Sequence, residues 1–154
     1  MTASVLTDAM AEGKLQRGLI ERAEWGGWQC YHVTNVRTTL LTYNTTAAGF
    51  QDLNLVHGPR ALFVYAELKD RDRDKNPKEE QARWARAVAL AARFCPDRVF
   101  CVWWRPQHYD EALRFLAGET DVPPNVVTVE ESQQWLDRAA SAKQSTRRKR
   151  RTKR

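Results

Sequence analysis

Two short apolar segments separated by a four-residue turn are the feature that most limits the folds open to this chain. The first segment spans residues 49–56 (GFQDLNLV) and the second spans residues 61–69 (ALFVYAELK). The intervening residues 57–60 (HGPR) contain a Gly-Pro pair, which is typical of a tight turn. We therefore predict a β-hairpin, so the start of the first strand lies beside the end of the second.

Charged residues occupy the end of this hairpin away from the turn. Asp52 lies near the start of the first strand, and Glu67 and Lys69 close the second. Residues two apart on a strand share a face, so two carboxylates and one ammonium are expected to meet at one end of a mostly apolar sheet. Hard divalent ions such as Mg²⁺ are held by one or two carboxylates plus substrate phosphate, and a nearby lysine can stabilise charge that develops during phosphodiester hydrolysis.

Asp52, Glu67 and the backbone carbonyl of Leu68 are thus the candidate metal ligands, with Lys69 facing the nucleophile. The residues alone also allow a structural interpretation. In that interpretation Glu67 and Lys69 form the polar end of an edge strand, and Asp52 is a turn acid.

Helical and strand patterns alternate along the rest of the chain and predict an α/β domain with a four-stranded sheet. A helix is expected between the third and fourth strands, and such a crossover permits those two strands to run parallel. Residues 34–48 and 70–76 are expected to form loops. The remaining predicted elements are a helix from about Thr7 to Trp25, a strand at Trp28–Val33, a helix from Pro77 to about Phe94, a strand at Val99–Trp104, and helices over about His108–Leu116 and Glu130–Ala142.

The positive charge of the chain is concentrated at its C-terminus. The net charge is +6, yet eight of the 25 Lys and Arg residues lie in residues 143–154, which contain no acid. Residues 1–142 thus hold 17 bases against 19 acids, a net charge of −2. We expect residues 143–154 to be disordered alone and to attract a polyanion through counterion release. A solubilising terminus and a nuclear-import signal are the other interpretations.

The size and composition of the chain limit the class of protein. Its 154 residues, 42% of them hydrophobic, suit one domain with a sizeable core. Three cysteines (Cys30, Cys95 and Cys101) form no CxxC pair, so we expect buried free thiols rather than a disulfide framework or a zinc site. No apolar stretch is long enough to span a bilayer, and the N-terminus does not resemble a signal peptide, which favours the cytoplasm, that of a host if the chain is virus-encoded.

Several motifs in order resemble the virus-type replication-repair nuclease (VRR-NUC) family, a branch of the PD-(D/E)xK nucleases. The similar region runs from about Glu12 to Leu116, roughly two thirds of the chain. Its motifs are residues 49–53 (GFQDL), residues 66–69 (AELK), Gln81 and Trp84, and residues 102–106 (VWWRP). The resemblance implies a restriction-endonuclease-like core with the element order αβββαβ and a phosphodiesterase that uses Mg²⁺, with Mn²⁺ as a substitute and no small-molecule cofactor.

By position, the resemblance makes Asp52 and Glu67 metal ligands, Lys69 the catalytic lysine and Gln81 an additional active-site residue. Glu12 and Gln16 fall where the family has an acid and a glutamine, so Glu12 would complete the metal shell directly or through water. One departure is Gln51, which stands where the family usually has a proline. Since that proline is not a ligand, we expect little effect on the chemistry.

Other candidate residues contact nucleic acid in this interpretation. Trp28 and His32 match a Gly-Trp-x-x-x-His stretch of the family. His32 fits a phosphate contact or a hydrogen-bonded core histidine, and Arg37 fits a phosphate contact or a solvated arginine. Trp84, Trp103 and Trp104 fit the core better than a base-stacking platform. The candidate nucleic-acid contacts are Gln16, His32, Arg37, Arg147, Arg148, Lys149, Arg150 and Arg151.

The combined prediction is a metal-dependent DNA endonuclease at residues 1–117, a helical extension at 118–142 and a basic tail at 143–154. The absence of a base-reading motif favours selectivity for DNA structure, such as Holliday junctions or other branched DNA in replication, recombination or repair. Stand-alone members of the family resemble junction resolvases that act as homodimers, which implies a homodimer and no membrane partner. Two alternatives remain open: a non-catalytic nucleic-acid-binding protein that acts through the tail, and an RNase with the same site.

Overall fold

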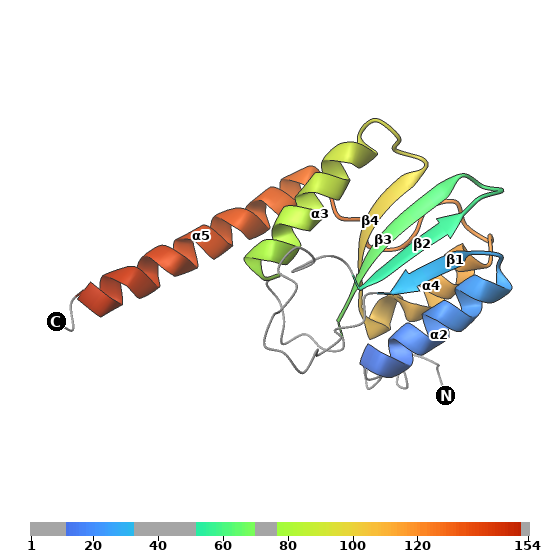
Figure 1. Cartoon of the computed structure of the whole chain (residues 1–154), viewed down its shortest axis with the longest axis horizontal. Coiled ribbons are helices and arrows are strands. Elements are labelled where there is room, and N and C mark those ends of the chain that lie inside the picture. Colours follow the sequence, from blue (N-terminus) through green and yellow to red (C-terminus); the bar gives the residue numbers. More distant parts are fainter. Residues whose placement is uncertain (1–11, 33–51, 70–76, 152–154) are drawn as a thin grey trace, which may run out of the picture.

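The computed structural model describes residues 12–32, 52–69 and 77–151 of the chain (Figure 1). The predicted helix start at Thr7, the loop at 34–48 with Arg37, and the loop at 70–76 lie outside these residues. The described elements are α2 (Glu12–Trp25), β1 (Gln29–His32), β2 (Leu53–His57), β3 (Leu62–Leu68), α3 (Glu79–Ala92), β4 (Val99–Trp104), the 3₁₀ turn η2 (Pro106–His108), α4 (Tyr109–Leu116) and α5 (Val129–Arg151).

The four strands form one mixed sheet in the order β1-β2-β3-β4. β1 pairs with β2 and β2 with β3 in antiparallel fashion, whereas β3 and β4 are parallel because α3 carries the chain across between them. This arrangement confirms the predicted α/β class and the mixed four-stranded sheet. The hairpin turn lies one residue later than expected, since β2 continues to His57 and Ala61 adopts a positive φ of 51°.

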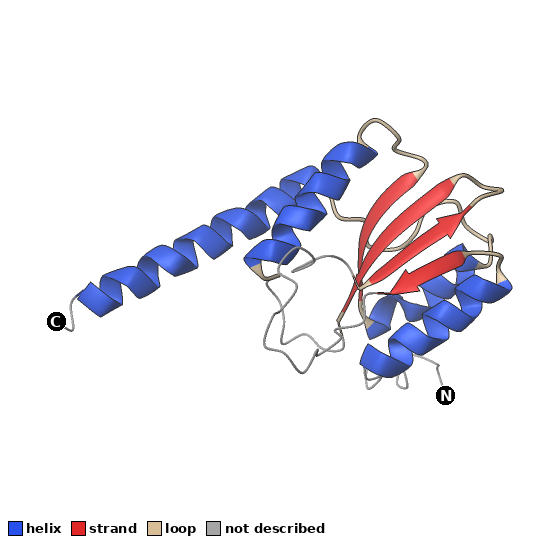
Figure 2. Ribbon diagram, viewed as in Figure 1, coloured by secondary structure: helices blue, strands red, loops and turns tan. Residues whose placement is uncertain are grey.

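Helices cover both faces of the sheet, so the domain has three layers (Figure 2). On one face, α2 and α4 pack against alternate residues of β2, β3 and β4, and the largest side chains of this cluster are Trp28, Trp104 and Phe115. On the other face, α3 and α5 enclose a smaller cluster around Trp103 and Trp135. The alternation places Ala66 and Leu68 in the first cluster, so Glu67 projects toward the side of α3.

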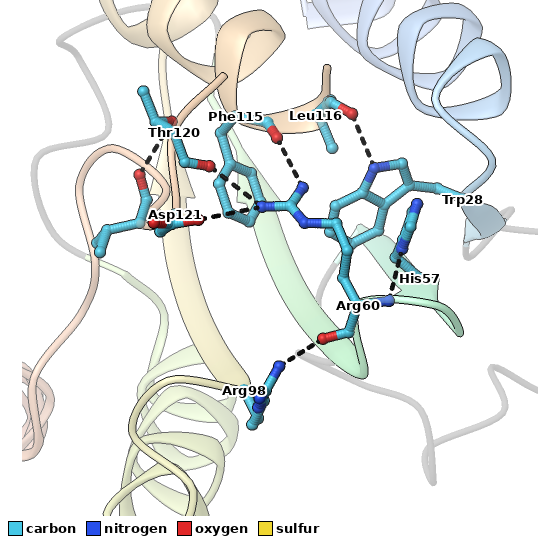
Figure 3. A network of polar contacts seen from close by, with 9 residues as sticks. Trp28, His57, Arg60, Arg98, Phe115, Leu116, Thr120 and Asp121 are labelled. Atoms are coloured by element: carbon cyan, nitrogen blue, oxygen red, sulfur yellow. Dashed lines mark hydrogen bonds and ion pairs between the residues drawn. The ribbon is translucent and has the colours of Figure 1, made fainter. Parts of the chain in front are cut away.

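A polar network fastens the turn end of the hairpin to α4 (Figure 3). The Arg60 guanidinium donates to the carbonyl oxygens of Phe115 at 3.3 Å and Thr120 at 3.2 Å, and it lies over the Phe115 ring. Nearby, the Trp28 indole N–H donates to the Leu116 carbonyl at 2.9 Å. These contacts lie at the opposite end of β3 from Glu67, so they support the fold rather than the candidate site.

The last helix corrects one sequence prediction. α5 does not end near Ala142 but continues to Arg151, so residues 143–151 are helical rather than a disordered tail (Figure 1). Its first half packs on α3, where Arg86 Nε donates to Gln133 Oε1 at 2.7 Å. Lysine and arginine are good helix formers, and a preformed helix needs no new nucleus to extend through them.

The cysteines correct a second prediction. Cys101 is buried in β4, but Cys30 is half-buried and Cys95 is exposed in the turn that follows α3. Position along the chain did not distinguish them, because Cys95 falls at the four-residue spacing of the buried face of α3 just after that helix has ended at Ala92.

Candidate active site

Asp52 and Glu67 come together at the end of the sheet away from the hairpin turn. Leu53 pairs with Ala66 across β2 and β3, which places Asp52 opposite Glu67. Asp52 Oδ2 accepts a hydrogen bond of 2.9 Å from the backbone N–H of Leu68. Since that N–H belongs to the peptide that joins Glu67 to Leu68, the Asp52 carboxylate lies against the backbone that carries the Glu67 side chain.

Glu67 is almost completely buried, with an exposed fraction of 3%. It accepts a hydrogen bond from the Gln81 side-chain amide and forms an ion pair with Lys69, whose Nζ lies 2.8 Å from Glu67 Oε1. Burial of a carboxylate is costly unless charged and polar partners compensate for it. The two donors supply this compensation and hold the carboxylate in one orientation.

Lys69 follows β3 directly and is fixed at both its backbone and its side chain. Its backbone N–H donates to the Trp104 carbonyl at 3.0 Å. Its Nζ lies 5.4 Å from the centroid of the Trp103 ring, within the range of a cation–π interaction. The ammonium therefore rests between a carboxylate from its own strand and an aromatic ring from β4.

Gln81 enters the site from the first turn of α3. Its side-chain oxygen accepts the Lys78 backbone N–H at 3.0 Å, a contact that caps the start of the helix. Because the oxygen is engaged in this way, the amide nitrogen faces Glu67. The site glutamine thus depends on where α3 begins, and Pro77 and the acids of the first turn favour that start.

Gln16 and His32 meet in a separate hollow at the same end of the sheet. They line it together with Gly13, Arg17, Ile20 and Glu21, between α2 and β1. His32 is opposite Leu53, the residue after Asp52. Glu12 is the first residue of α2, next to Gly13 of the hollow, and its side chain lies outside the described residues. Arg17 was not selected from the sequence, since only the packing of α2 on β1 places it beside His32.

The basic end of α5 passes close to the start of α3. Lys143 forms an ion pair with Glu79, which is two residues before Gln81, and this contact lowers the pKa of Glu79. Beyond Lys143, the last turns of α5 contain Arg147, Arg148, Lys149, Arg150 and Arg151. The basic residues predicted from the sequence to contact nucleic acid therefore extend from the end of the domain that holds the candidate site.

The donor chemistry of this site fits a hard divalent ion. Among the residues described, no group of three or more His, Cys, Asp and Glu side chains is arranged to hold a metal. Two carboxylates and a backbone carbonyl are nevertheless sufficient for Mg²⁺, which commonly retains waters and takes oxygen from substrate phosphate. Beside this site, burial and the nearby Glu67 and Glu131 raise the pKa of the Cys101 thiol to about 12.

We compared the chain with known proteins. The chain matches no protein-family model, no curated protein and no solved structure. In the described part of the chain, no helix is both long and apolar enough to cross a membrane.

Proposed function

We propose that this chain is a divalent-metal-dependent DNA endonuclease. The observation that carries the proposal is the convergence of Asp52, Glu67, Lys69 and Gln81 from three separate elements on one end of the sheet. These are the side chains that the sequence motifs selected, and each is held by a specific contact. A carboxylate pair with an adjacent ammonium is suited to phosphodiester hydrolysis.

The burial of the site argues against the purely structural interpretation. β3 lies between β2 and β4, so Glu67 and Lys69 do not form the polar end of an edge strand. The side chains of the pair are only 4% and 14% exposed, respectively. A solvated surface pair needs no such enclosure, whereas a buried ion pair must be held by specific partners to offset its loss of hydration.

In the proposed reaction the chain's own groups have distinct tasks. Asp52, Glu67 and the Leu68 carbonyl would hold the ion, which when bound would polarise the phosphate and activate a water for in-line attack. Lys69 would stabilise negative charge that develops on the phosphate oxygens. Gln81 keeps the Glu67 carboxylate oriented, and Glu12 is proposed to complete the ligand set.

The basic residues of α5 support DNA as the partner. The segment from Lys143 to Arg151 rises about 12 Å along the helix, enough to follow a few phosphates beyond the site. Neutralisation of phosphates by these side chains would release counterions and make binding depend on salt. Gln16, Arg17 and His32 would provide further polar contacts on the α2 side of the site.

The finer features of the proposal come from the resemblance to VRR-NUC proteins. They are selectivity for Holliday junctions or other branched DNA, action as a homodimer, and a role in replication, recombination or repair. The two hypotheses about the substrate and the assembly are tested separately from catalysis, by the ranking of DNA substrates and by the mass of the protein–DNA complex.

The direct test is cleavage of labelled four-way-junction, linear duplex and single-stranded DNA, and of RNA, with Mg²⁺, Mn²⁺ or EDTA. Wild type is compared with Lys69→Ala and with Arg22→Ala, which removes an exposed basic side chain from the last turn of α2. We expect metal-dependent cutting by wild type and Arg22→Ala, and a loss of at least about 100-fold in Lys69→Ala. Equal cutting by Lys69→Ala, or preference for RNA, would overturn the proposal in this form.

A non-catalytic nucleic-acid-binding protein is the second candidate, and the basic end of α5 is the observation that favours it. Deletion of residues 143–154 separates the two. If the chain is a nuclease, the deletion should weaken DNA binding and reduce the salt dependence of that binding. Short substrates at saturating concentration should still be cut. Loss of all binding in the deletion variant, with no metal that supports cutting by wild type, would establish the binding protein instead.

A further inference from the structure

Trp103 occupies an unusual position for a residue of the core. It pairs with Glu67 across β3 and β4, and its exposed fraction is 5%. The Lys69 Nζ lies 5.4 Å from its ring centroid, and the Trp135 ring of α5 packs against it at a centroid distance of 5.1 Å. The indole is therefore in contact with the Lys69 ammonium and is supported by α5.

We infer that Trp103 is a positioning residue that keeps the Lys69 ammonium in place when a divalent ion occupies the site. This inference rests on the proposed nuclease function. A cation over an indole face is attracted by the ring quadrupole, and the attraction is stronger when water is excluded. The side chain of Lys69 is 14% exposed, so this condition is met.

The contact between Trp103 and Lys69 matters because the other partner of Lys69 is itself a proposed metal ligand. Glu67 lies 2.8 Å from the Lys69 Nζ and is also a proposed metal ligand. A divalent ion bound to Glu67 would partly neutralise the carboxylate and so weaken the attraction of Glu67 for the Lys69 ammonium. The ion would also repel the ammonium directly. An indole ring carries no oxygen ligand for a hard cation and no net charge, so its attraction for Lys69 persists in the presence of the ion.

The packing of Trp103 on α5 provides a control for the inference. Trp135 holds the Trp103 ring on the side of α3 and α5, and both tryptophans belong to one buried cluster. The Lys69 Nζ lies over the Trp103 ring, and Trp135 packs against that same ring. Substitution of Trp135 thus perturbs the packing of this cluster while the ring beneath the ammonium is retained.

A first test measures cleavage by Trp103→Leu, Trp103→Phe and the matched control Trp135→Leu. We expect kcat/KM to fall about 2- to 30-fold in Trp103→Leu, as the loss of a cation–π contact would produce, with most of the loss in kcat. Trp103→Phe should recover most of the activity, because an aromatic face remains. An equal loss in Trp135→Leu, or no recovery with Phe, would show that Trp103 acts only through packing.

A second test does not depend on cleavage and uses the wild-type protein. The side-chain methylene protons of Lys69, assigned with the Lys69→Met variant, should show an upfield ring-current shift in NMR spectra, and this shift should persist on titration with Mg²⁺. Movement of the signals to ordinary lysine positions on addition of Mg²⁺ would overturn the inference. Absence of cleavage by wild type with a retained shift would refute the nuclease proposal and leave the placement of Lys69 by Trp103 established.

Discussion

Substitution of Lys69 by Met removes one partner of a buried ion pair and leaves the Glu67 carboxylate enclosed. Loss of one partner of such a pair typically costs about 3–5 kcal/mol. We expect about 3 kcal/mol for Lys69→Met, near the lower end of this range, because the Gln81 amide still donates to Glu67. For a domain of this size each kcal/mol shifts Tm by about 2–4 °C, so Tm should fall by about 6–12 °C.

The reasoning also predicts the behaviour of a double variant. Glu67→Gln removes the carboxylate charge that Lys69→Met leaves without its ammonium partner, and it keeps the shape of the side chain. The double variant Lys69→Met/Glu67→Gln should therefore be about 1–3 kcal/mol more stable than Lys69→Met alone. The assay is urea unfolding in EDTA, which keeps divalent ions out of the comparison. Lys14→Met, at an exposed site of α2, serves as the control and should stay within about 0.5 kcal/mol of wild type. A Lys69→Met variant within about 1 kcal/mol of wild type, or a double variant no more stable than it, would refute the account of the buried pair.

Four further predictions concern the cysteines, Gln81 and Arg60. Alkylation at pH 8 should label the exposed Cys95 and spare Cys101, whose pKa is raised to about 12 by burial, and labelling of both at one rate would contradict this. Because the folded pKa of Cys101 exceeds the ordinary thiol value of 9.0, the free energy of unfolding should fall as pH rises from about 9 toward 12, and Cys101→Ala should lessen this fall in urea titrations. Gln81→Leu should cost about 1–3 kcal/mol in the same unfolding assay, since Glu67 loses a donor, and it should reduce cleavage, whereas unchanged cleavage would remove Gln81 from the site. Arg60→Met should cost about 1–3 kcal/mol by loss of two carbonyl contacts but leave cleavage unchanged, because it lies at the turn end of the sheet.

Local patterns were sufficient where a segment is bounded by strong signals. Residues 99–104 form β4 with the predicted limits, because an uninterrupted apolar run ends at Arg105-Pro106 and is buried on both faces. The start of α3 also agrees to within two residues, since Pro77 and the following acids favour a helix N-terminus. In contrast, α5 extends nine residues past its predicted end at Ala142, as continuation of an existing helix outweighs the repulsion expected of a basic run.

For the candidate site, the sequence alone determined that Asp52, Glu67 and Lys69 share one end of a hairpin, because strand alternation and a tight turn leave few other arrangements. Only the tertiary structure decided that β3 is an interior strand, that Gln81 reaches Glu67, and that Trp103 lies against Lys69. It also decided that His32 and Arg17 share one hollow. These contacts join residues far apart in the chain or on different elements. Their geometry follows from how helices and strands pack around a common core, which no local periodicity encodes.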